Sequence, residues 1–194
     1  MIKWLIGNNQ RCRVLRLHLY CDNSHYENLP DGWDLCRLKD VFNIVMGQSP
    51  DGDTINNLSG IEFHQGKIFF TQNYLSYSGI YTNKPTKIAK PHSLLLCVRA
   101  PVGVLNITDR TICIGRGLCA LTPKYDIDTL YWLYILSAYK DYFEREATGS
   151  TFKAISGDII KNTIIPLPPL NEQVRITEMI SSLWKILDTI AAEL

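Results

Sequence analysis

The sequence lacks several features that would assign a protein to a class directly. Nowhere do about 18 apolar residues follow one another, so no membrane span is indicated. The opening MIKWLIGNN has too short an apolar run for a signal peptide, and we therefore expect a cytoplasmic protein. The cysteines form no CxxC pair, and no histidine stands at zinc-finger spacing. This excludes the common structural zinc sites and predicts reduced thiols, several of them buried, at Cys12, Cys21, Cys36, Cys97, Cys113 and Cys119.

Nucleotide and dinucleotide sites are also missing, although two stretches come near them. The loop from Gly47 to Thr54 has phosphate-loop spacing, but Asp53 stands where a lysine must reach the phosphates. A carboxylate at that position would repel the ligand. The stretch from Gly115 to Ala120 matches GxGxxA, but the chain then reaches Pro123 instead of opening a helix. Neither stretch predicts a cofactor.

Catalytic constellations are absent as well. A methyltransferase needs an acidic Pro-Pro-aromatic loop, whereas Pro168 and Pro169 lie between two leucines. The carboxylates of Asp51 and Asp53 come closest to a metal-binding pair, but Gly-rich acidic loops are usually turns. The four histidines are scattered along the chain. We expect a non-catalytic polypeptide that needs no cofactor and no metal.

Charge is nearly balanced, at +1, but it is unevenly distributed. From Lys84 to Arg116 there are six Lys or Arg against one acid, Asp109, so that segment is +5. From Asp126 to Glu146 five acids face two bases. One part of the molecule is therefore suited to a polyanion that another part repels, although any mixed surface shows some fluctuation of this kind.

The pattern of short apolar runs predicts an α+β fold, a β-rich domain with one core helix. Runs punctuated by Gly, Pro, Asn and Lys predict mostly antiparallel strands. We expect a core helix from Asp126 to Glu146, capped by Asp126 or Asp128, with its aromatic residues in the core. Ser156 is predicted to cap a short helix at Gly157–Asn162, before a final strand at Thr163–Leu167. The expected strands are Asp34–Met46 with a turn at Leu38–Asp40, Ile68–Thr71, Ser93–Val98, Val102–Ile107 and Ile112–Ile114.

The chain ends in a long helix of coiled-coil type, predicted from Asn171 because the prolines before it prevent an earlier start. Apolar residues recur in it at steps of 4, 3, 4, 3 and 4, the a/d spacing of a coiled-coil seam. We expect this seam to be a partner interface, or to lie against a globular body. It consists of Ile176, Ile180, Leu183, Leu187, Ile190 and Leu194.

The order of these pieces resembles a known family. The sequence GSTF, then a polar turn, then IIPLPPLNEQ and a heptad helix, is similar to the end of a target-recognition domain in the specificity (S) subunit of type I restriction-modification systems. The resemblance continues upstream through LPDGW at 29–33, GQSP at 47–50 and FHQG at 63–66. Family S subunits carry two such halves, so the chain resembles a half-subunit or a fragment. Residues 1–28 form a poorly defined segment, and the resemblance implies a recognition domain 29–167 followed by a spacer or dimerisation helix 168–194.

The resemblance further implies that the protein reads one half of a split sequence in double-stranded DNA. Methyltransferase (M) and restriction (R) subunits would supply the chemistry, and the helix would form a homodimer. Lys and Arg suit phosphates and guanine edges, and polar loop residues suit base edges. The GST turn either contacts the DNA backbone or merely ends a helix at Gly149. The implied DNA-binding residues are Gln48, Ser49, Gln72, Asn73, Lys84, Lys87, Lys90, Arg99, Arg116, Ser150, Thr151 and Lys153.

Two other interpretations remain open at this point. In the first, the chain is a silent or truncated specificity cassette without independent activity. In the second, it is the recognition domain of a larger single-chain restriction enzyme. A catalytic domain elsewhere in the gene would identify the second.

Overall fold

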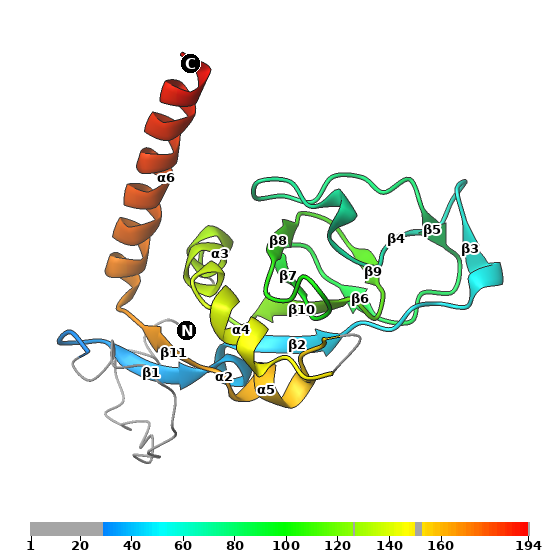
Figure 1. Ribbon diagram of the computed structural model, residues 1–194, viewed down its shortest axis with the longest axis horizontal. Helices are drawn as coiled ribbons and strands as arrows, with labels where there is room; N and C mark the ends of the chain where they lie inside the picture. Colours follow the sequence, from blue (N-terminus) through cyan, green and yellow to red (C-terminus); the bar gives the residue numbers. More distant parts are fainter. Residues whose placement is uncertain (1–28, 126, 150–152, 194) are drawn as a thin grey trace.

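Short strands separated by turns build the body of the protein, and one long helix leaves it (Figure 1). The computed structural model describes residues 29–125, 127–149 and 153–193. The expected α+β class, with a core helix and a long C-terminal helix, is confirmed. The helices are α2 (Leu38–Val41), α3 (Thr129–Ser137), α4 (Lys140–Glu146), α5 (Gly157–Asn162) and α6 (Leu170–Ala192), with 3-10 turns η2 (Gly52–Thr54) and η3 (Lys67–Phe69).

An antiparallel four-stranded sheet lies at the centre, in the order β2-β10-β7-β8. Its central strand β7 is buried on both faces, which is why it reads as the continuous apolar run SLLLC. Leu94 and Leu96 face the helices, and Leu95 and Cys97 face the other way, as the two-residue period of a strand requires. The strands are β2 (Phe42–Met46), β10 (Leu118–Pro123), β7 (Ser93–Cys97) and β8 (Leu105–Thr108).

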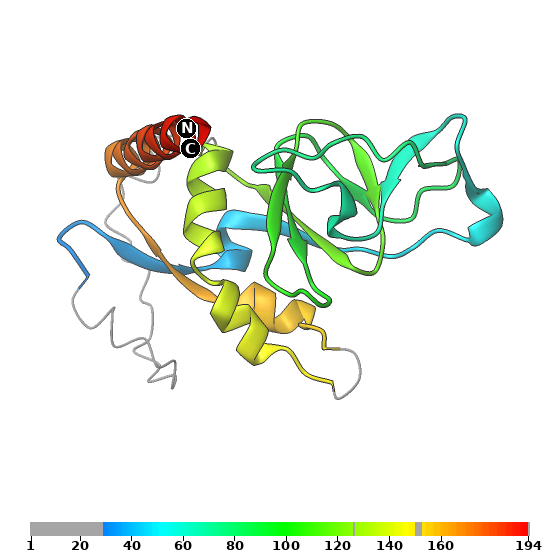
Figure 2. The same cartoon turned by 45° about the horizontal axis from the view of Figure 1, so that its top comes forward.

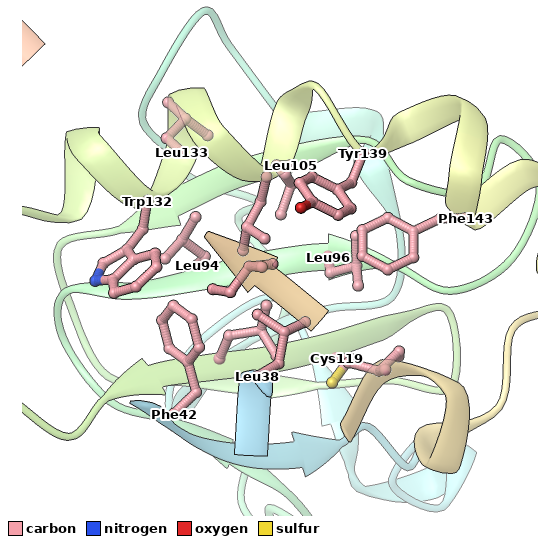
Figure 3. Packing of buried hydrophobic residues seen from close by; sticks show 14 of the residues in the cluster. Leu38, Phe42, Leu94, Leu96, Leu105, Cys119, Trp132, Leu133, Tyr139 and Phe143 are labelled. Atoms are coloured by element: carbon pink, nitrogen blue, oxygen red, sulfur yellow. The ribbon is translucent and has the colours of Figure 1, made fainter. Parts of the chain in front are cut away.

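The larger core lies between this sheet and α3 (Figure 3). Trp132 is fully buried, and its ring meets Phe42 edge-on at 4.8 Å between centroids. Tyr131, Tyr139 and Phe143 are buried with it, so most of the aromatic residues are in the core, as predicted. Asp128 caps α3 by accepting the Leu130 amide at 3.0 Å.

A five-stranded sheet covers the other face of β7, at the end of the body far from α6 (Figure 1). Its order is β3-β5-β4-β9-β6, and β4 and β9 run parallel while the other neighbours are antiparallel. The prediction of mostly antiparallel strands is therefore confirmed. The strands are β3 (Ile55–Asn56), β5 (Tyr81–Thr82), β4 (Ile61–His64), β9 (Ile112–Ile114) and β6 (Ile88–Ala89).

A separate two-stranded ladder anchors the long helix. Strand β1 (Asp34–Arg37) pairs antiparallel with β11 (Ile164–Leu167), from Asp34 opposite Leu167 to Arg37 opposite Ile164. Pro168 and Pro169 follow, and α6 begins at Leu170, one residue before the predicted start. The ladder fixes where α6 leaves the body, and the first turns of the helix lie beside α3 (Figures 1 and 2).

The predicted single helix from Asp126 to Glu146 was wrong, because it is two helices. The chain breaks at Ala138 and Tyr139, where the Tyr139 amide bonds back to the Leu136 carbonyl at 3.1 Å, a tight turn rather than a continuing helix. Ser137 also bonds the Leu133 carbonyl at 2.7 Å, a contact that bends helices. The break brings Phe143 into the same core as Leu136.

Three strand predictions also need correction. Lys67–Phe69 forms the 3-10 turn η3, so no strand spans Ile68–Thr71. Strand β8 begins at Leu105 and not at Val102, because Gly103, at a φ of 84°, lies in a turn. The segment Asp34–Met46 divides into β1, α2 and β2, with α2 at the predicted turn.

Candidate nucleic-acid interface

Three loop segments contact one another through their backbones, and glycines make this close approach possible. A Cβ on Gly47 would lie 2.1 Å from the Gly115 carbonyl oxygen. A Cβ on Gly117 would lie 2.2 Å from the Gln65 carbonyl oxygen. Both distances are shorter than any real contact, so no side chain fits at either position. The segments 47–49, 65–67 and 115–117 are thus held in fixed relative positions.

Backbone hydrogen bonds tie the same segments together. The Gly115 amide donates to the His64 carbonyl at 2.7 Å, and the Gln48 amide donates to the Ile114 carbonyl at 3.0 Å. The Arg116 amide lies 3.5 Å from Ser49 Oγ, which accepts its hydrogen. Gln48 and Arg116 are exposed, and Ser49 is half-buried. Three of the predicted DNA-binding residues therefore lie side by side.

Lys87, just before β6, and Arg99, two residues after β7, join this group. Thr86 Oγ1 donates to the Gln48 carbonyl, and the Ile114 amide donates to the Lys87 carbonyl at 2.9 Å, which places Lys87 beside the loop. Arg99 lines a pocket of about 170 Å³ together with Gly117. We call the exposed edge formed by Gln48, Ser49, Lys87, Arg99 and Arg116 the basic rim.

Lys153 lies next to the basic rim. Ala154, its neighbour, pairs with Arg99 in an isolated bridge and also pairs with Thr148 through two hydrogen bonds of 2.9 Å. Gly149 has a φ of 115°, in the left-handed region that favours glycine. Ser150 and Thr151 lie outside the described residues.

The remaining predicted residues lie elsewhere. The Asn73 carbonyl accepts the Ile107 amide at 2.9 Å, which places Gln72 and Asn73 beside β8. The Lys84 amide donates to Thr82 Oγ1 at 3.2 Å, at the end of β5. The Lys90 carbonyl accepts the Ser93 amide at 3.2 Å, at the start of β7.

Sequence reasoning missed two residues that belong beside the basic rim. Gln65 and Lys67 line the same pocket as Arg99. The signal was present in the FHQG motif and the lysine after it, a polar turn between two apolar runs, but that motif served only to indicate the family.

One cation of the basic segment has its charge neutralised internally. Arg110 Nε donates to Glu62 Oε2 at 2.6 Å, and Arg110 Nη1 donates to Asp109 Oδ1 at 2.8 Å. The guanidinium also stacks on the Tyr77 ring at 3.9 Å. The hydrogen bond to Glu62 raises the pKa of Arg110 further above its usual value. The charge available to a polyanion in Lys84–Arg116 is therefore smaller than the count suggests.

The described residues offer little for other chemistry. Across residues 29–125, 127–149 and 153–193, no group of three or more His, Cys, Asp or Glu is placed to hold a metal ion. Burial raises the pKa of Cys97 to about 11 and of Cys119 to about 12, so both thiols stay protonated and unreactive near neutral pH. In the same ranges no helix is both long and apolar enough to cross a membrane.

The predicted seam of α6 divides into two parts. Ile176 packs on the core, Ile180 is half-buried, and the Tyr134 hydroxyl lies 3.4 Å from Ser181 Oγ, so the first part lies against α3. Leu183 and Leu187, in contrast, are 54% and 53% exposed. Ile190 is similarly exposed, and Leu194 lies outside the described residues.

Known proteins match almost the whole described chain. The family model for the type I restriction modification DNA specificity domain matches residues 30–194. The putative type I restriction enzyme MjaX specificity subunit of Methanocaldococcus jannaschii is 35% identical over 175 residues, covering 88% of this chain and 41% of that protein. The MjaIX specificity subunit of the same organism is 27% identical over 164 residues, covering 79% and 38%.

Two solved structures also resemble the chain. The HsdS subunit from Thermoanaerobacter tengcongensis superimposes with a TM-score of 0.75 at 35% identity, covering 86% of this chain and 40% of that one. A chain from a study of complex assembly and conformational transition of the type I R-M system gives 0.74 at 39% identity, covering 84% and 41%. The chain spans about two fifths of the length of each of these relatives. It belongs to the family of type I restriction-modification DNA specificity domains, as its motifs had indicated.

Proposed function

We propose that the chain is the non-catalytic DNA-recognition module of a type I restriction-modification complex, acting in the cytoplasm. It reads one half of a bipartite duplex target and directs M and R subunits, which carry out methylation and cleavage. The observation that carries this proposal is the basic rim, where residues with cationic and amide side chains lie on separate segments that are joined by backbone contacts.

The chemistry of the rim suits duplex DNA. Arg99 and Arg116 present planar guanidinium groups, which bind phosphates or pair with O6 and N7 of guanine. Gln48 can pair with adenine through its amide. Because the loops that carry these groups are held by backbone contacts, little backbone entropy is lost when they bind. Lys153 extends the same edge, and Ser150 and Thr151 remain proposed backbone contacts. Gln72, Asn73, Lys84 and Lys90 remain candidates on other surfaces.

The two proposed roles, DNA recognition and pairing, belong to successive parts of the chain. Residues 29–167 form the recognition unit, and 168–194 form the spacer that joins it to a partner. The exposed half of the α6 seam supports pairing with another helix, either in an M subunit or in a second copy of this chain. An isolated apolar strip of this kind is unfavourable in water.

The proposal is tested by reversing charge on and off the rim. Arg99→Glu with Arg116→Glu should weaken binding to random duplex by roughly tenfold or more at moderate salt, because two cationic contacts become repulsive. Lys84→Glu with Lys90→Glu is the matched control, since it makes the same charge change within the same basic segment. The protein is co-expressed with its M subunit, and binding is measured by fluorescence anisotropy at two salt concentrations.

Equal losses in the two variants would show that DNA does not prefer the rim over the surface of Lys84 and Lys90, which contradicts the proposal. A loss confined to the Lys84 and Lys90 pair would place the DNA surface away from the rim. Failure of the unmodified protein to bind would favour a silent cassette.

A further inference from the structure

We propose that the turn Gln65–Ile68 contacts base edges in duplex DNA, with Gln65 and Lys67 on polar groups and Ile68 on a thymine methyl. This inference rests on the proposed function and adds a specificity element to it. The juxtaposition that carries it is a turn whose residues line two hollows, one bordered by cationic side chains and one mostly apolar.

The two hollows share the turn. The pocket of about 170 Å³ is lined by Gln65, Lys67 and Arg99 among others, and is bordered by cationic side chains. A second hollow of about 380 Å³ is lined by Phe63, Gln65, Gly66, Ile68, Phe69 and Ile80, and is mostly apolar. A phosphate needs only a cationic surface such as that of the first hollow. Base edges in the major groove need both, because thymine presents a methyl group beside polar donors and acceptors.

The exposure of Ile68 fits this use. Its side chain is 87% exposed, while Phe69 and Phe70, which follow it, pack on the core between the sheets. A single exposed isoleucine is common on protein surfaces and would carry no argument by itself. Here Ile68 lines the apolar hollow and directly follows Lys67, which lines the basic one.

The turn is fixed before any ligand arrives. The Phe70 amide donates to the Lys67 carbonyl, and the Ser76 amide and hydroxyl both donate to the Phe69 carbonyl, each at 2.9 Å. On the other side, Gln65 rests directly on Gly115 and Gly117. The ring of His64 meets Phe69 edge-on at 5.5 Å between centroids. A turn held in this way can meet bases without a cost for ordering its backbone.

The residue types suit particular bases. Glutamine pairs in two-point fashion with N6 and N7 of adenine, lysine donates to guanine, and an aliphatic side chain packs on the thymine methyl. Removing such contacts should relax discrimination at one or two base pairs, whereas removing a phosphate contact weakens binding uniformly across sequences. The two roles are therefore separable by experiment.

The test compares two alanine pairs of matched chemistry. Gln65→Ala with Ile68→Ala removes the proposed readers. Asn57→Ala with Leu58→Ala removes an exposed amide and an exposed aliphatic side chain from another loop, Leu58 being 90% exposed. Each full-length variant is co-expressed with the M subunit, sequences are selected from a randomised duplex pool, and affinity for selected and random duplex is compared. Thermal unfolding checks that each variant folds.

The Gln65 and Ile68 pair should lower the ratio of selected to random affinity by roughly 5- to 100-fold, with relaxed preference at one or two positions. The control pair should leave the ratio unchanged. Retained discrimination, an equal loss in the control, or an equal loss on random duplex would each overturn the proposal. If the double variant unfolds, Gln65→Asn, which shortens the amide by one methylene, replaces it. If the unmodified protein selects no sequence, the proposed function is wrong, and this inference, which rests on it, is wrong as well.

Discussion

Among single residues, Glu62 ties together segments that are distant in the sequence. Its buried carboxylate accepts the Ser78 amide at 2.6 Å, His64 Nε2 at 2.9 Å and two bonds from Arg110. Arg110 in turn donates to the Leu75 and Ser76 carbonyls at 3.1 and 3.0 Å. The loop between Thr71 and Ile80 is therefore held to β4 by charge-assisted hydrogen bonds, which are stronger than neutral ones.

This network predicts an acid-dependent loss of stability. Burial alone would raise the pKa of Glu62, but the hydrogen bonds from Arg110, Ser78 and His64 outweigh it and lower the pKa from 4.5 to about 2. A carboxyl whose folded pKa is depressed stabilises the protein above its unfolded pKa and loses that contribution as pH falls toward the folded value. The contribution lost between about pH 4.5 and 2 is up to about 3 kcal/mol.

Urea unfolding of the protein and of Glu62→Gln, measured between pH 7 and pH 2.5, checks this expectation. The variant should be less stable by about 1–3 kcal/mol at pH 7, because the buried end of Arg110 loses its charged partner Glu62. Its stability should also depend less on pH below 4.5 than that of the unmodified protein. Parallel pH profiles would show that Glu62 is not the group that titrates.

Arg110 and Gln65 show where residue-level reasoning from sequence stops. Counting charge included Arg110 in the +5 segment, but the count does not reveal a carboxylate that folding brings to it from 48 positions away. The sequence shows Gln65 only as a polar residue, because its close contact with Gly115 and Gly117 is formed by folding. Gln48 and Ser49 were predicted as polar loop residues and Arg116 as part of a basic segment, and both features show locally in the sequence.

Among the elements, α6 shows two environments along one apolar stripe. Ile176 packs on the core, whereas Leu187 is 53% exposed. Ile176→Asp should therefore destabilise the fold by roughly 1–3 kcal/mol, because it buries a charge without a partner. Leu187→Asp should leave the thermal midpoint nearly unchanged, because surface substitutions usually cost within about 0.5 kcal/mol, and should instead weaken assembly.

Thermal unfolding and sedimentation velocity separate these effects. Ser182→Asp introduces the same charge on the same helix, outside the apolar seam, and serves as the control. If Leu187→Asp lowers the midpoint as much as Ile176→Asp does, the far part of α6 also contributes to the fold. Unchanged assembly in Leu187→Asp would remove the seam as a partner interface.

Elements set by local chemistry were predictable, and those set by distant packing were not. Ser156 accepts the Ile159 amide at 3.3 Å and starts α5 where expected, and the prolines after Leu167 limit β11. The break between α3 and α4 falls inside a continuous apolar pattern, so periodicity could not locate it. Close approach of Gly103 to Lys140, at 3.1 Å from a Cβ placed on the glycine, belongs to the tertiary structure alone.

For the whole molecule, the proposed pairing predicts the symmetry of the DNA target. The 23 residues of α6 span about 35 Å at roughly 1.5 Å per residue, close to one turn of B-DNA. The β1–β11 ladder joins the recognition unit to the N-terminal end of this helix. Two copies joined by antiparallel helices would have two-fold symmetry, so they should read the same half-site twice as a gapped palindrome.

Selection from a randomised duplex pool, with the protein co-expressed with its M subunit, measures that symmetry. Two identical inverted half-sites are expected for the unmodified protein, about one helical turn apart, because the length of α6 sets the spacing. Leu187→Asp should select one half-site without the second, since it removes pairing and leaves the basic rim intact. Unlike half-sites in the selected pool would contradict the homodimer and show that a different recognition unit occupies the second position.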